Sequence, residues 1–446
     1  MTNKKHSSPV TRHPSPVTRH ASLLTLLAVS FLIYLNSLPN DFIFDDIPLV
    51  QNSINVLSTG FWDLIRSYRP LRYITYSIDY RIFGMNPWGF RLMNIIYHSL
   101  TVISLFRMLK VFGLTKRAAF ISALIFAVHP VHTDSVAYIS GRRDVLMGLF
   151  YVLSVGCFMK FYNGIRETAK DAKDAKEETP SQTLAPEGEG LKHPFPLGEG
   201  AGERSNNESS ASHSLRLKYF IYLILSLLFM FFSISSKEMG ATIPLIFVLY
   251  IFYKDGSKLF AKKWFYPTVM SFLLLFSFFA FYAISGGGSG LASLSGFQFH
   301  GNSPEVHYLT AATIWFHYLK QIVFPFQLIL DNANYPLVLD WNFKVFFSIL
   351  SMFVYGWIVY LTLNPSQTSP QTPLLNERGL KPPLPLGKGS GERSYPSPIT
   401  THAIAFFLLF FVIALAPVLQ IIPLHEIVAL HYLYVPSIGF LSLIHI

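Results

Sequence analysis

The sequence is poor in charged residues and almost free of cysteine. Only 13% of its 446 residues are Asp, Glu, Lys or Arg, whereas a soluble globular domain carries about 25%. Hydrophobic residues make up 51%, aromatic residues 16%, and the mean hydropathy is +0.39. This composition excludes a soluble enzyme and a disordered protein, and it indicates a membrane protein. The single cysteine, Cys157, excludes an internal disulfide framework and a cysteine-based zinc cluster.

The motifs of common soluble enzymes are also missing. The sequence has no Walker loop, no Gly-x-Ser-x-Gly, no His-Glu-x-x-His and no protein-kinase set. The formal net charge is +10, but Lys and Arg cluster beside apolar segments. That pattern is typical of cytoplasmic anchoring, so we expect a lipid bilayer and not a nucleic acid as their partner.

Apolar runs long enough to cross a bilayer occupy much of the chain. A spanning helix needs about 20 apolar residues, so the sequence predicts an all-α polytopic membrane protein with about ten transmembrane helices, the first a retained signal anchor. The predicted spans are residues 21–38, 93–109, 118–131, 145–162, 219–235, 239–253, 265–285, 345–363, 401–422 and 432–446. Residues 308–330 are apolar but hold His317 and Lys320, and we expect them to be interfacial or re-entrant.

Lysine and arginine set the orientation, because cytoplasmic loops are enriched in them. The N-terminal tail and residues 107–117 and 254–263 are basic, which places them inside. The predicted outer loops are residues 39–92, 132–144, 236–238, 286–344 and 423–431. We therefore expect a multi-pass protein of the cell membrane with its candidate functional residues on the outer face.

Two inserts rich in Pro, Gly, Ser and charge interrupt the membrane body. Such composition is typical of disordered segments, and the two inserts share a phrase identical at 11 of 15 positions, in residues 191–205 and 380–394. The predicted organisation is a cytoplasmic tail (1–20), a membrane module with the outer loops (21–163), a cytoplasmic insert (164–215), a second membrane module (216–363), a second cytoplasmic insert (364–400) and C-terminal helices (401–446).

The strongest candidate for chemistry is the pair Asp45 and Asp46, just outside the first predicted span. Like-charged carboxylates that converge in a loop raise the pKa of one of them. One could then take a proton from a nucleophile while the other orients it or binds a metal. The alternative is a solvated acidic turn, which the neighbouring Phe42, Phe44 and Ile47 make costly at a membrane surface.

Arginines in the same outer loop form the second feature. Arg69 and Arg72 come at near-helical spacing with Asp79 and three tyrosines. Arginine offers a forked, permanently charged donor suited to phosphate. We consider two roles for an amphipathic helix at this place: anchoring to lipid headgroups, or binding a lipid-linked phosphate.

A third group of polar residues fills the short outer loop that follows. It consists of His129, His132, Asp134, Arg142, Arg143 and Asp144. The two histidines and the first aspartate resemble a metal set, but nothing distal completes such a site. Hydrogen bonding to a phosphate or a sugar is the better interpretation, with one of the two arginines as the phosphate partner.

Two further features open onto the same side. Lys237 and Glu238 lie between apolar helices, where charges are costly unless partners satisfy them. They form either a local ion pair at a helix corner or a polar wall of the site. His431 precedes the last predicted span, where helix capping and anchoring by Tyr432 and Tyr434 is the alternative to a role in the site.

Four of the five features lie on the predicted outer side and the fifth opens onto it, while the predicted helix centres are nearly free of charge. A transporter instead places its polar groups at mid-bilayer. The pattern therefore favours an enzyme at the outer membrane surface whose substrate arrives through the lipid. A polyprenyl carrier that bears a phosphate fits this description.

The ordered motifs resemble a known family. The order is FxFDD in the first outer loop, then HPxHTDxVAxIxGRxDxL, then SKEMG after a predicted span, then YLYVPSIGF. This set is similar to the transmembrane and tetratricopeptide-repeat O-mannosyltransferase family and its bacterial relatives, which belong to the GT-C glycosyltransferases. The likeness spans roughly residues 36–440 apart from the two inserts.

The resemblance implies transfer of a sugar, mannose in the eukaryotic members, from a polyprenyl-phosphate carrier to Ser or Thr hydroxyls of proteins on the outer face of a membrane, here a bacterial inner membrane. We expect no metal and no cofactor besides this donor. The residues that match the family motifs are Asp45 and Asp46 (one of them a general base), His129, His132, Asp134, Arg142 and Asp144, and the pair Lys237 and Glu238.

The chain departs from the family near its end. Family members usually carry an acidic residue just before the final YLYxPS, where this sequence has Leu430 and His431, with Glu426 one helical turn earlier. The soluble repeats should follow, but the sequence ends at Ile446, so we expect a chain without that module. Two alternatives stay open: the same chemistry on a glycolipid or polysaccharide acceptor, and a non-enzymatic transporter of polyprenyl lipids.

Overall fold

The computed structural model describes residues 16–67, 69–177, 201–256, 262–284, 299–326, 328, 335–364, 398–424 and 426–445. Within these ranges the chain forms helices and no strand. The segments in this part that are long and apolar enough to cross a membrane are His20–Ser37, Pro87–Phe112, Ile139–Lys170, Leu217–Ser236, Phe343–Leu363 and Thr401–Val418. The prediction of an all-α membrane protein with several spans is thereby confirmed.

A bent helix pair adds a seventh candidate span. Helix α6 (Lys116–Val128) passes the same test together with residues Pro130–Val136, but the two parts are bent by 51°. His129 has an extended backbone and Pro130 has no amide hydrogen with which to continue α6, so the helix breaks here. The short helix α7 (Thr133–Val136) follows the break.

The predicted number of about ten transmembrane helices is not confirmed. Residues 432–446 hold only the seven-residue α16 (Pro436–Ser442) and short 3-10 turns, which are too short to span. Helix α10 (Ile243–Asp255) has 13 residues, or about 20 Å at 1.5 Å per residue, against a bilayer core of about 30 Å. Helix α11 (Lys262–Ile284) has 23 residues, but only its stretch Tyr266–Ala280 counts as apolar, and it is not among the candidate spans. The spans predicted from composition at these three places are therefore not confirmed.

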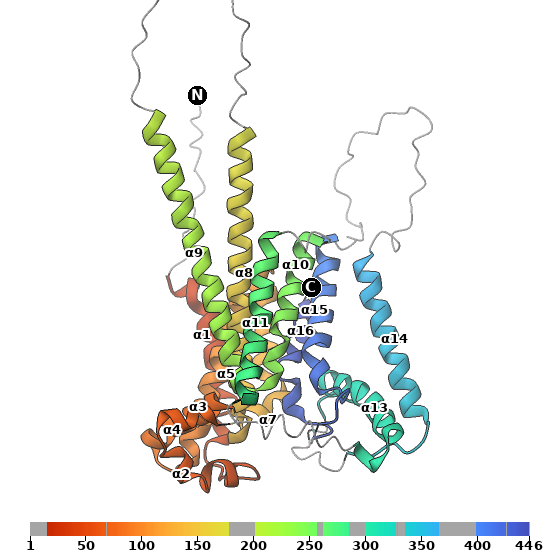
Figure 1. The fold of residues 1–446 in the computed structure, drawn as a ribbon. Helices are drawn as coiled ribbons and strands as arrows, with labels where there is room; N and C mark the ends of the chain where they lie inside the picture. Colours follow the sequence, from red (N-terminus) through yellow and green to blue (C-terminus); the bar gives the residue numbers. More distant parts are fainter. Residues whose placement is uncertain are drawn as a thin grey trace, which may run out of the picture.

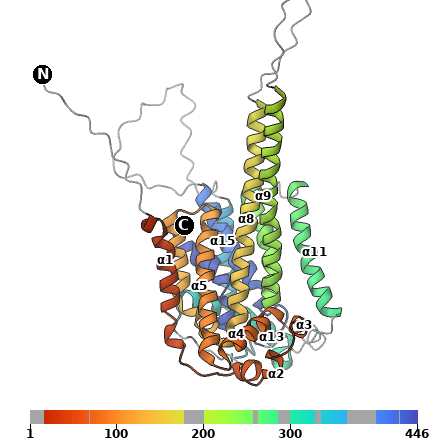
Figure 2. The same cartoon turned by 90° about the vertical axis from the view of Figure 1, so that its left-hand side faces the viewer.

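Helices α5 and α8 occupy the middle of the bundle. α5 (Pro87–Phe112) packs against α1 (Pro16–Leu32), α6 and α8 (Arg142–Glu177), and α8 also packs along α9 (Ala201–Ser236). α8 and α9 continue together beyond the ends of the other helices (Figures 1 and 2). α15 (Pro398–Leu415) packs against α10 and α16 on the other side of the bundle.

The long helices alter the boundaries of the predicted inserts. Residues 164–215 were assigned to the first insert, but α8 continues to Glu177 and α9 begins at Ala201. Residues 178–200 lie outside the described residues. The same holds for residues 365–397 of the second insert and residues 1–15 of the predicted tail.

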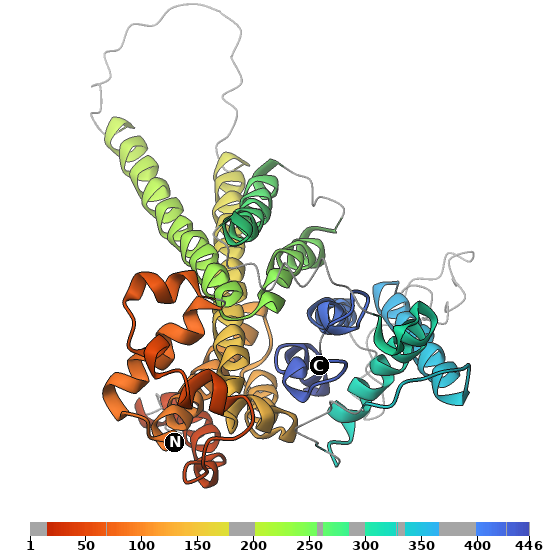
Figure 3. The same cartoon turned by 60° about the horizontal axis from the view of Figure 1, so that its bottom comes forward.

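Five helices from the connecting segments of the described chain lie at one end of the bundle, which we call the site end. These are α2 (Ile54–Leu57), α3 (Phe61–Arg66), α4 (Pro70–Phe83), α7 and α13 (Pro304–Val323) (Figure 1). Figure 3 looks onto this end and shows α13 and α14 (Phe343–Leu363), in teal and light blue, across the bundle from the red-to-orange N-terminal segment. Residues 308–330, expected to be interfacial or re-entrant, lie largely in α13, which is not among the candidate spans.

Arg91 of α5 ties the loop after α1 to the site end. Its buried side chain donates from Nε to the carbonyl of Ala137 at 3.0 Å, and from its terminal nitrogens to the carbonyls of Asn40 and Asp41. Tyr76 of α4 is fixed in a similar way, because its hydroxyl donates to the carbonyl of Ile139 at 2.8 Å. Loops from two parts of the sequence, around residues 40–41 and 137–139, are thus held by side chains of two helices.

Candidate active site

The two adjacent acids, Asp45 and Asp46, point in different directions. Phe44 adopts a left-handed backbone with φ of 44°, an uncommon conformation for a non-glycine residue, and the chain turns there. Asp46 is fully buried and accepts hydrogen bonds from the amide and hydroxyl of Ser140, both at 2.8 Å. Asp45 is exposed, and its amide donates to the Tyr138 hydroxyl at 2.8 Å. Only Asp45 offers a free carboxylate to a substrate.

Asp46 therefore fixes the loop. Its second oxygen accepts from the amide of Ile43 at 3.4 Å, so both carboxylate oxygens have donors within the protein. Burial raises the pKa of Asp46, while the hydrogen bonds from Ser140 lower it. A carboxylate held in this way orients the turn that presents Asp45, and we assign it to positioning.

Arg142 is likewise occupied inside the protein. Its Nε donates to Asn94 at 2.8 Å, one terminal nitrogen pairs with Asp79, and the other donates to the carbonyl of Phe90 at 2.6 Å. Its guanidinium also lies 4.6 Å from the ring centre of Tyr76. With all three nitrogens bound to protein groups, Arg142 joins α4, α5 and α8.

The two histidines of the broken helix pair do not converge on a common point. His129 bonds to the carbonyl of Ile322 at 3.0 Å and accepts from the amide of Val131 at 3.2 Å. His132 is fully buried between the carbonyl of Phe126 and the hydroxyl of Ser437, at 2.8 and 2.9 Å. A search of the described residues for three or more His, Cys, Asp or Glu placed to hold a metal ion finds none.

A buried chain of charges lies beside them. The Lys237 ammonium donates to Asp144 at 2.5 Å and lies 4.6 Å from the ring centre of Tyr432. The other oxygen of Asp144 is 3.4 Å from Nε of Arg143. A terminal nitrogen of Arg143 lies 3.1 Å from Nε2 of His431.

The chain of charges ends at Asp134. One oxygen of this carboxylate accepts from both the amide and Nδ1 of His431, at 3.1 and 3.0 Å. Burial lowers the pKa of His431 to about 3, with Lys237 adding to the effect, so its ring is neutral near pH 7. Asp134 thus sets the orientation of His431, and His431 in turn holds the guanidinium of Arg143.

Two half-exposed acids, Glu238 and Glu426, lie at the edge of this group of charges. Glu238 is half-exposed and pairs with Arg69 through two contacts, at 2.8 and 3.2 Å. Arg69 precedes α4 with a left-handed backbone, φ of 59°, which turns the chain into the helix. Glu426 is also half-exposed and reaches Arg143 at 3.7 Å and His431 at 3.4 Å. We call the residues of this region the charged cluster: Asp45, Arg69, Arg72, Asp134, Arg143, Asp144, Lys237, Glu238, Glu426 and His431.

Arg72 differs from every other cation of the cluster. Its side chain is 2% exposed, and its guanidinium lies 4.7 Å from the ring centre of Tyr73. Among the described residues it has no carboxylate partner and no hydrogen-bond acceptor. Burial lowers the pKa of Arg72, and the charges of Arg69 and Arg143 lower it further. A buried guanidinium without an acceptor is costly, and an anion placed beside it would relieve that cost.

The charged groups of the cluster interact electrostatically. The guanidinium of Arg143 is attracted by the carboxylates of Asp144, Glu426 and the exposed Asp45. Burial lowers the pKa of Lys237 to about 8; Asp144 opposes this shift, and Arg143 and Arg69 add to it. An exposed carboxylate therefore stands near several buried cations, an arrangement that suits transfer of a group to a hydroxyl with an anionic leaving group.

The sequence identified most members of the cluster and missed two. Asp45, Arg69, Arg72, Asp134, Asp144, Lys237, Glu238 and His431 meet here, while Asp46, His129, His132 and Arg142 have internal partners. Arg143, left as an alternative to its neighbour, is the arginine that faces the cluster. Glu426, noted only as lying one turn before the final motif, takes part through its ion pair with Arg143 and its contact with the neutral ring of His431. The position of Glu426 between His425 and His431 is the feature of the sequence that could have indicated its role.

Comparison with known proteins gives a partial match. Residues 40–176 match the family model described as dolichyl-phosphate-mannose-protein mannosyltransferase. Among curated relatives, protein O-mannosyl-transferase tmtc2 of Xenopus laevis is 36% identical over 151 residues, 30% of this chain and 18% of the relative. Protein O-mannosyl-transferase TMTC2 of Homo sapiens is 33% identical over 150 residues, with the same shares. Protein O-mannosyl-transferase TMTC4 of Mus musculus is 33% identical over 186 residues, 35% of this chain and 24% of the relative.

These matches confirm the resemblance to protein O-mannosyltransferases for the N-terminal third of the chain. The matched part spans about a fifth of the length of the curated relatives. It includes the loop of Asp45, both arginines near the start of α4 and the start of α8. No solved structure matches the chain.

Proposed function

We propose that the charged cluster is the active site of a membrane glycosyltransferase. It would move a sugar, mannose by analogy with the names of the relatives, from a polyprenyl-phosphate carrier to Ser or Thr hydroxyls of proteins. The reaction would take place on the outer face of the membrane, an orientation of the site end that the distribution of Lys and Arg supports.

The observation that carries this proposal is the buried guanidinium of Arg72. Its cost is unexplained by any acceptor in the described part of the chain. A phosphate group offers the planar fork of arginine a bidentate, charge-assisted partner. Arg143, which Asp144 and His431 hold from behind, and Arg69 would approach the same anion from other sides.

The chemistry follows from the exposed acid and the buried cations. The acceptor hydroxyl gives its proton to the carboxylate of Asp45, and its oxygen forms a bond to the anomeric carbon of the sugar. The bond between that carbon and the phosphate oxygen breaks, and the carrier leaves as polyprenyl phosphate with the electron pair. The arginines offset the negative charge that develops on the leaving phosphate.

The remaining members of the cluster hold these groups in place. Asp144, which is paired with Lys237, lies 3.4 Å from Nε of Arg143, and His431, which Asp134 orients, lies 3.1 Å from a terminal nitrogen of Arg143. Asp46, anchored on Ser140, and Arg91, anchored on the backbone, hold the loop that carries Asp45. Such support keeps reacting groups within the narrow range that catalysis needs.

The test is a transfer assay with the purified chain, mannose linked to a polyprenyl phosphate, and a peptide rich in Ser and Thr. General base catalysis contributes about 10²–10⁴-fold, so Asp45→Asn is expected to lower the rate by that factor while the yield of folded protein persists. Asp41→Asn is the matched control, because Asp41 is an exposed acid of the same loop. Equal transfer by Asp45→Asn and the wild type would refute the proposal, and label found only in lipid would exclude a protein acceptor.

A further inference from the structure

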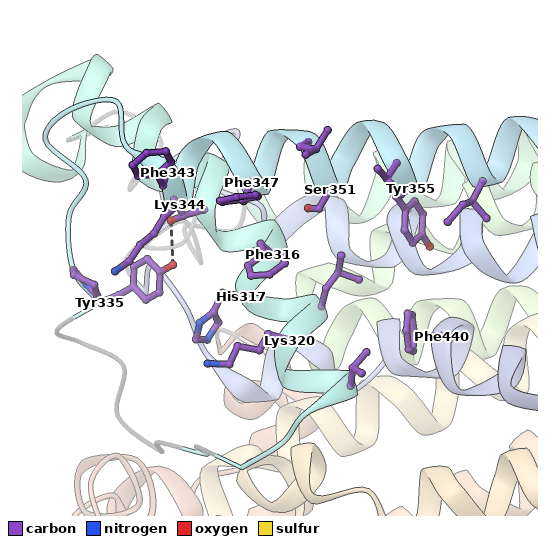
Figure 4. A pocket seen from close by; sticks show the side chains of 17 residues that line it. Phe316, His317, Lys320, Tyr335, Phe343, Lys344, Phe347, Ser351, Tyr355 and Phe440 are labelled. Carbon is purple, nitrogen blue, oxygen red and sulfur yellow. Dashed lines mark hydrogen bonds between the residues drawn. The ribbon is translucent and has the colours of Figure 1, made fainter.

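A cavity of about 1060 Å³ lies between α13 and α14, away from the charged cluster. Its walls are predominantly apolar, and Phe440 of α16 contributes to them (Figure 4). The cavity opens at the surface of the bundle and does not form an internal void, so a long molecule can enter it from the side. We call it the α13–α14 groove.

Positive charge marks one end of the groove. Lys320 and Lys344 line it there with His317 and Tyr335, and Figure 4 shows these four side chains at the end opposite Tyr355 and Phe440. None of the described lining residues is acidic, and neither lysine has an ion-pair partner in the described part of the chain. The groove therefore carries, at one end, two lysines without an ion-pair partner among the described residues.

His317 adds a polar atom to the same end. Its buried Nε2 has no hydrogen-bond partner among the described residues. Burial and the charge of Lys320 lower the pKa of His317 to about 4, so its ring is neutral near pH 7. The Tyr335 hydroxyl, in contrast, is already engaged with Thr313 at 3.0 Å. A neutral imidazole and two ammonium groups suit a phosphate without crowding it with a third charge.

The apolar wall has the length of a lipid chain. The lining residues of α14 recur every three to four positions between Phe343 and Ile358, so they form one stripe along the helix. Fifteen steps of 1.5 Å give about 22 Å, most of a bilayer core of about 30 Å. Since α14 is a candidate span that begins at the site end, the stripe runs from the charged mouth into the depth of the membrane.

Helix α13 separates the groove from the charged cluster. Its other face contacts the cluster side, where the Tyr318 hydroxyl accepts from the amide of Ala429 at 3.3 Å. The carbonyl of Ile322 meets His129 at 3.0 Å on that side as well. A phosphate between Lys320 and Lys344 would thus lie across a helix from Arg72 and Arg143, and could not be the group that reacts there.

We propose that the α13–α14 groove is a holding site for the polyprenyl monophosphate that the transfer reaction releases. The chain of this lipid lies along α14, and its phosphate lies between Lys320 and Lys344. The choice of this lipid rests on the proposed function. It also rests on charge: a phosphomonoester carries about −1.5 to −2 at pH 7, which two lysines match, whereas a sugar-bearing or diacyl phosphodiester carries a single charge.

The test is a binding measurement on the full chain in detergent, with a long-chain polyprenyl monophosphate as the probe. Lys320→Gln combined with Lys344→Gln is expected to weaken binding at least tenfold, and Lys116→Gln, an exposed lysine at the other end of the bundle, is the control. Ser351→Trp should also weaken binding, because it fills the groove about 12 Å from Phe343 without changing a charge. Wild-type binding by the double variant and by Ser351→Trp would overturn the proposal.

Two comparisons identify the ligand. Affinity of the wild type should fall as the pH is lowered through about 6, where the phosphomonoester loses its second charge, and the double variant should lack this dependence. Phosphatidylglycerol that binds as tightly as the probe and displaces it would overturn the proposal in favour of a general anionic-lipid surface. Inorganic phosphate that displaces the probe at equal concentration would also overturn it, because the chain would then contribute nothing.

The groove and the proposed reaction can fail separately. If the wild type transfers no mannose but binds the probe, and the double variant binds it weakly, the proposed reaction is refuted. The groove then remains a binding site for the polyprenyl monophosphate. If Asp45→Asn abolishes transfer while the double variant binds the probe normally, the groove alone is refuted.

Discussion

Two buried arginines at the site end should respond to the same substitution in opposite ways. Arg142 is fully buried and bound by Asp79, Asn94 and the carbonyl of Phe90. Arg72 is equally buried but has no acceptor among the described residues. Replacing each with methionine keeps much of the side-chain volume and removes the charge.

The stability change can be worked out from these contacts. Arg142→Met leaves the buried Asp79 without its cation, which costs about 3–5 kcal/mol. Arg72→Met removes a guanidinium whose burial costs several kcal/mol and forfeits one contact with a tyrosine ring worth about 2 kcal/mol. We therefore expect the free energy of unfolding to rise by about 1–2 kcal/mol in Arg72→Met and to fall in Arg142→Met.

Although Arg72→Met is expected to stabilise the fold, it should lower the rate of transfer. A forked guanidinium can donate two hydrogen bonds to a phosphate, each worth about 1.5–3 kcal/mol. Their loss is expected to lower kcat/KM by about 10²–10⁴-fold, at about 1.4 kcal/mol per factor of ten. Arg72→Lys keeps the charge but loses the forked pair of donors, so its kcat/KM should lie between those of the wild type and Arg72→Met.

Unfolding followed by intrinsic fluorescence in detergent, and initial rates of transfer to a peptide, measure both effects on the same preparations. The reasoning is refuted if Arg72→Met is less stable than the wild type by more than about 1 kcal/mol and still transfers mannose normally. Arg72 would then be a structural residue, and the anion would have to be held elsewhere.

Two further predictions concern pH and topology. Because the pKa of Lys237 is lowered to about 8, transfer should decline as the pH rises through 8 and Lys237 loses its proton; Lys237→Arg should move this decline to higher pH, and an unchanged alkaline limb in that variant would contradict the assignment. Trp62→Cys lies at the site end and Lys116→Cys at the opposite end, both exposed, so a membrane-impermeant maleimide added to intact cells should label only the first. Labelling of the second alone would invert the proposed orientation.

The sequence predicted the components of the charged cluster better than their partners. Local motifs fix residue types at close spacing, so Asp45, Lys237 and Asp144 could be selected from them. The pairs they form join residues far apart in the chain: Lys237 and Asp144 are 93 positions apart, and Arg143 and His431 are 288. No periodicity within one segment specifies such contacts, because they depend on how the helices pack.

Neighbouring residues of the same type posed a second difficulty. Asp45 and Asp46 have the same chemistry, and the left-handed backbone at Phe44 decides which of them is buried. Arg142 and Arg143 are consecutive on a helix, so they point about 100° apart, and only the position of α4 against α8 decides which one faces Asp79. In the same way, apolar composition predicted a final span at residues 432–446, where the structure has the short α16.

The hydrogen bonds of Arg91 connect the loop that carries Asp45, the proposed general base, to helix α5. This arginine belongs to α5, whose 26 residues measure about 39 Å, so the helix is longer than a hydrocarbon layer of about 30 Å and can adapt to its thickness by tilting. A thinner or thicker membrane would change that tilt, and the carbonyls of Asn40 and Asp41 would move with the arginine that holds them. If Asp45 is the general base that we propose, its reach towards an acceptor would therefore depend on membrane thickness, and the acyl-chain length of the lipid would affect the rate of transfer.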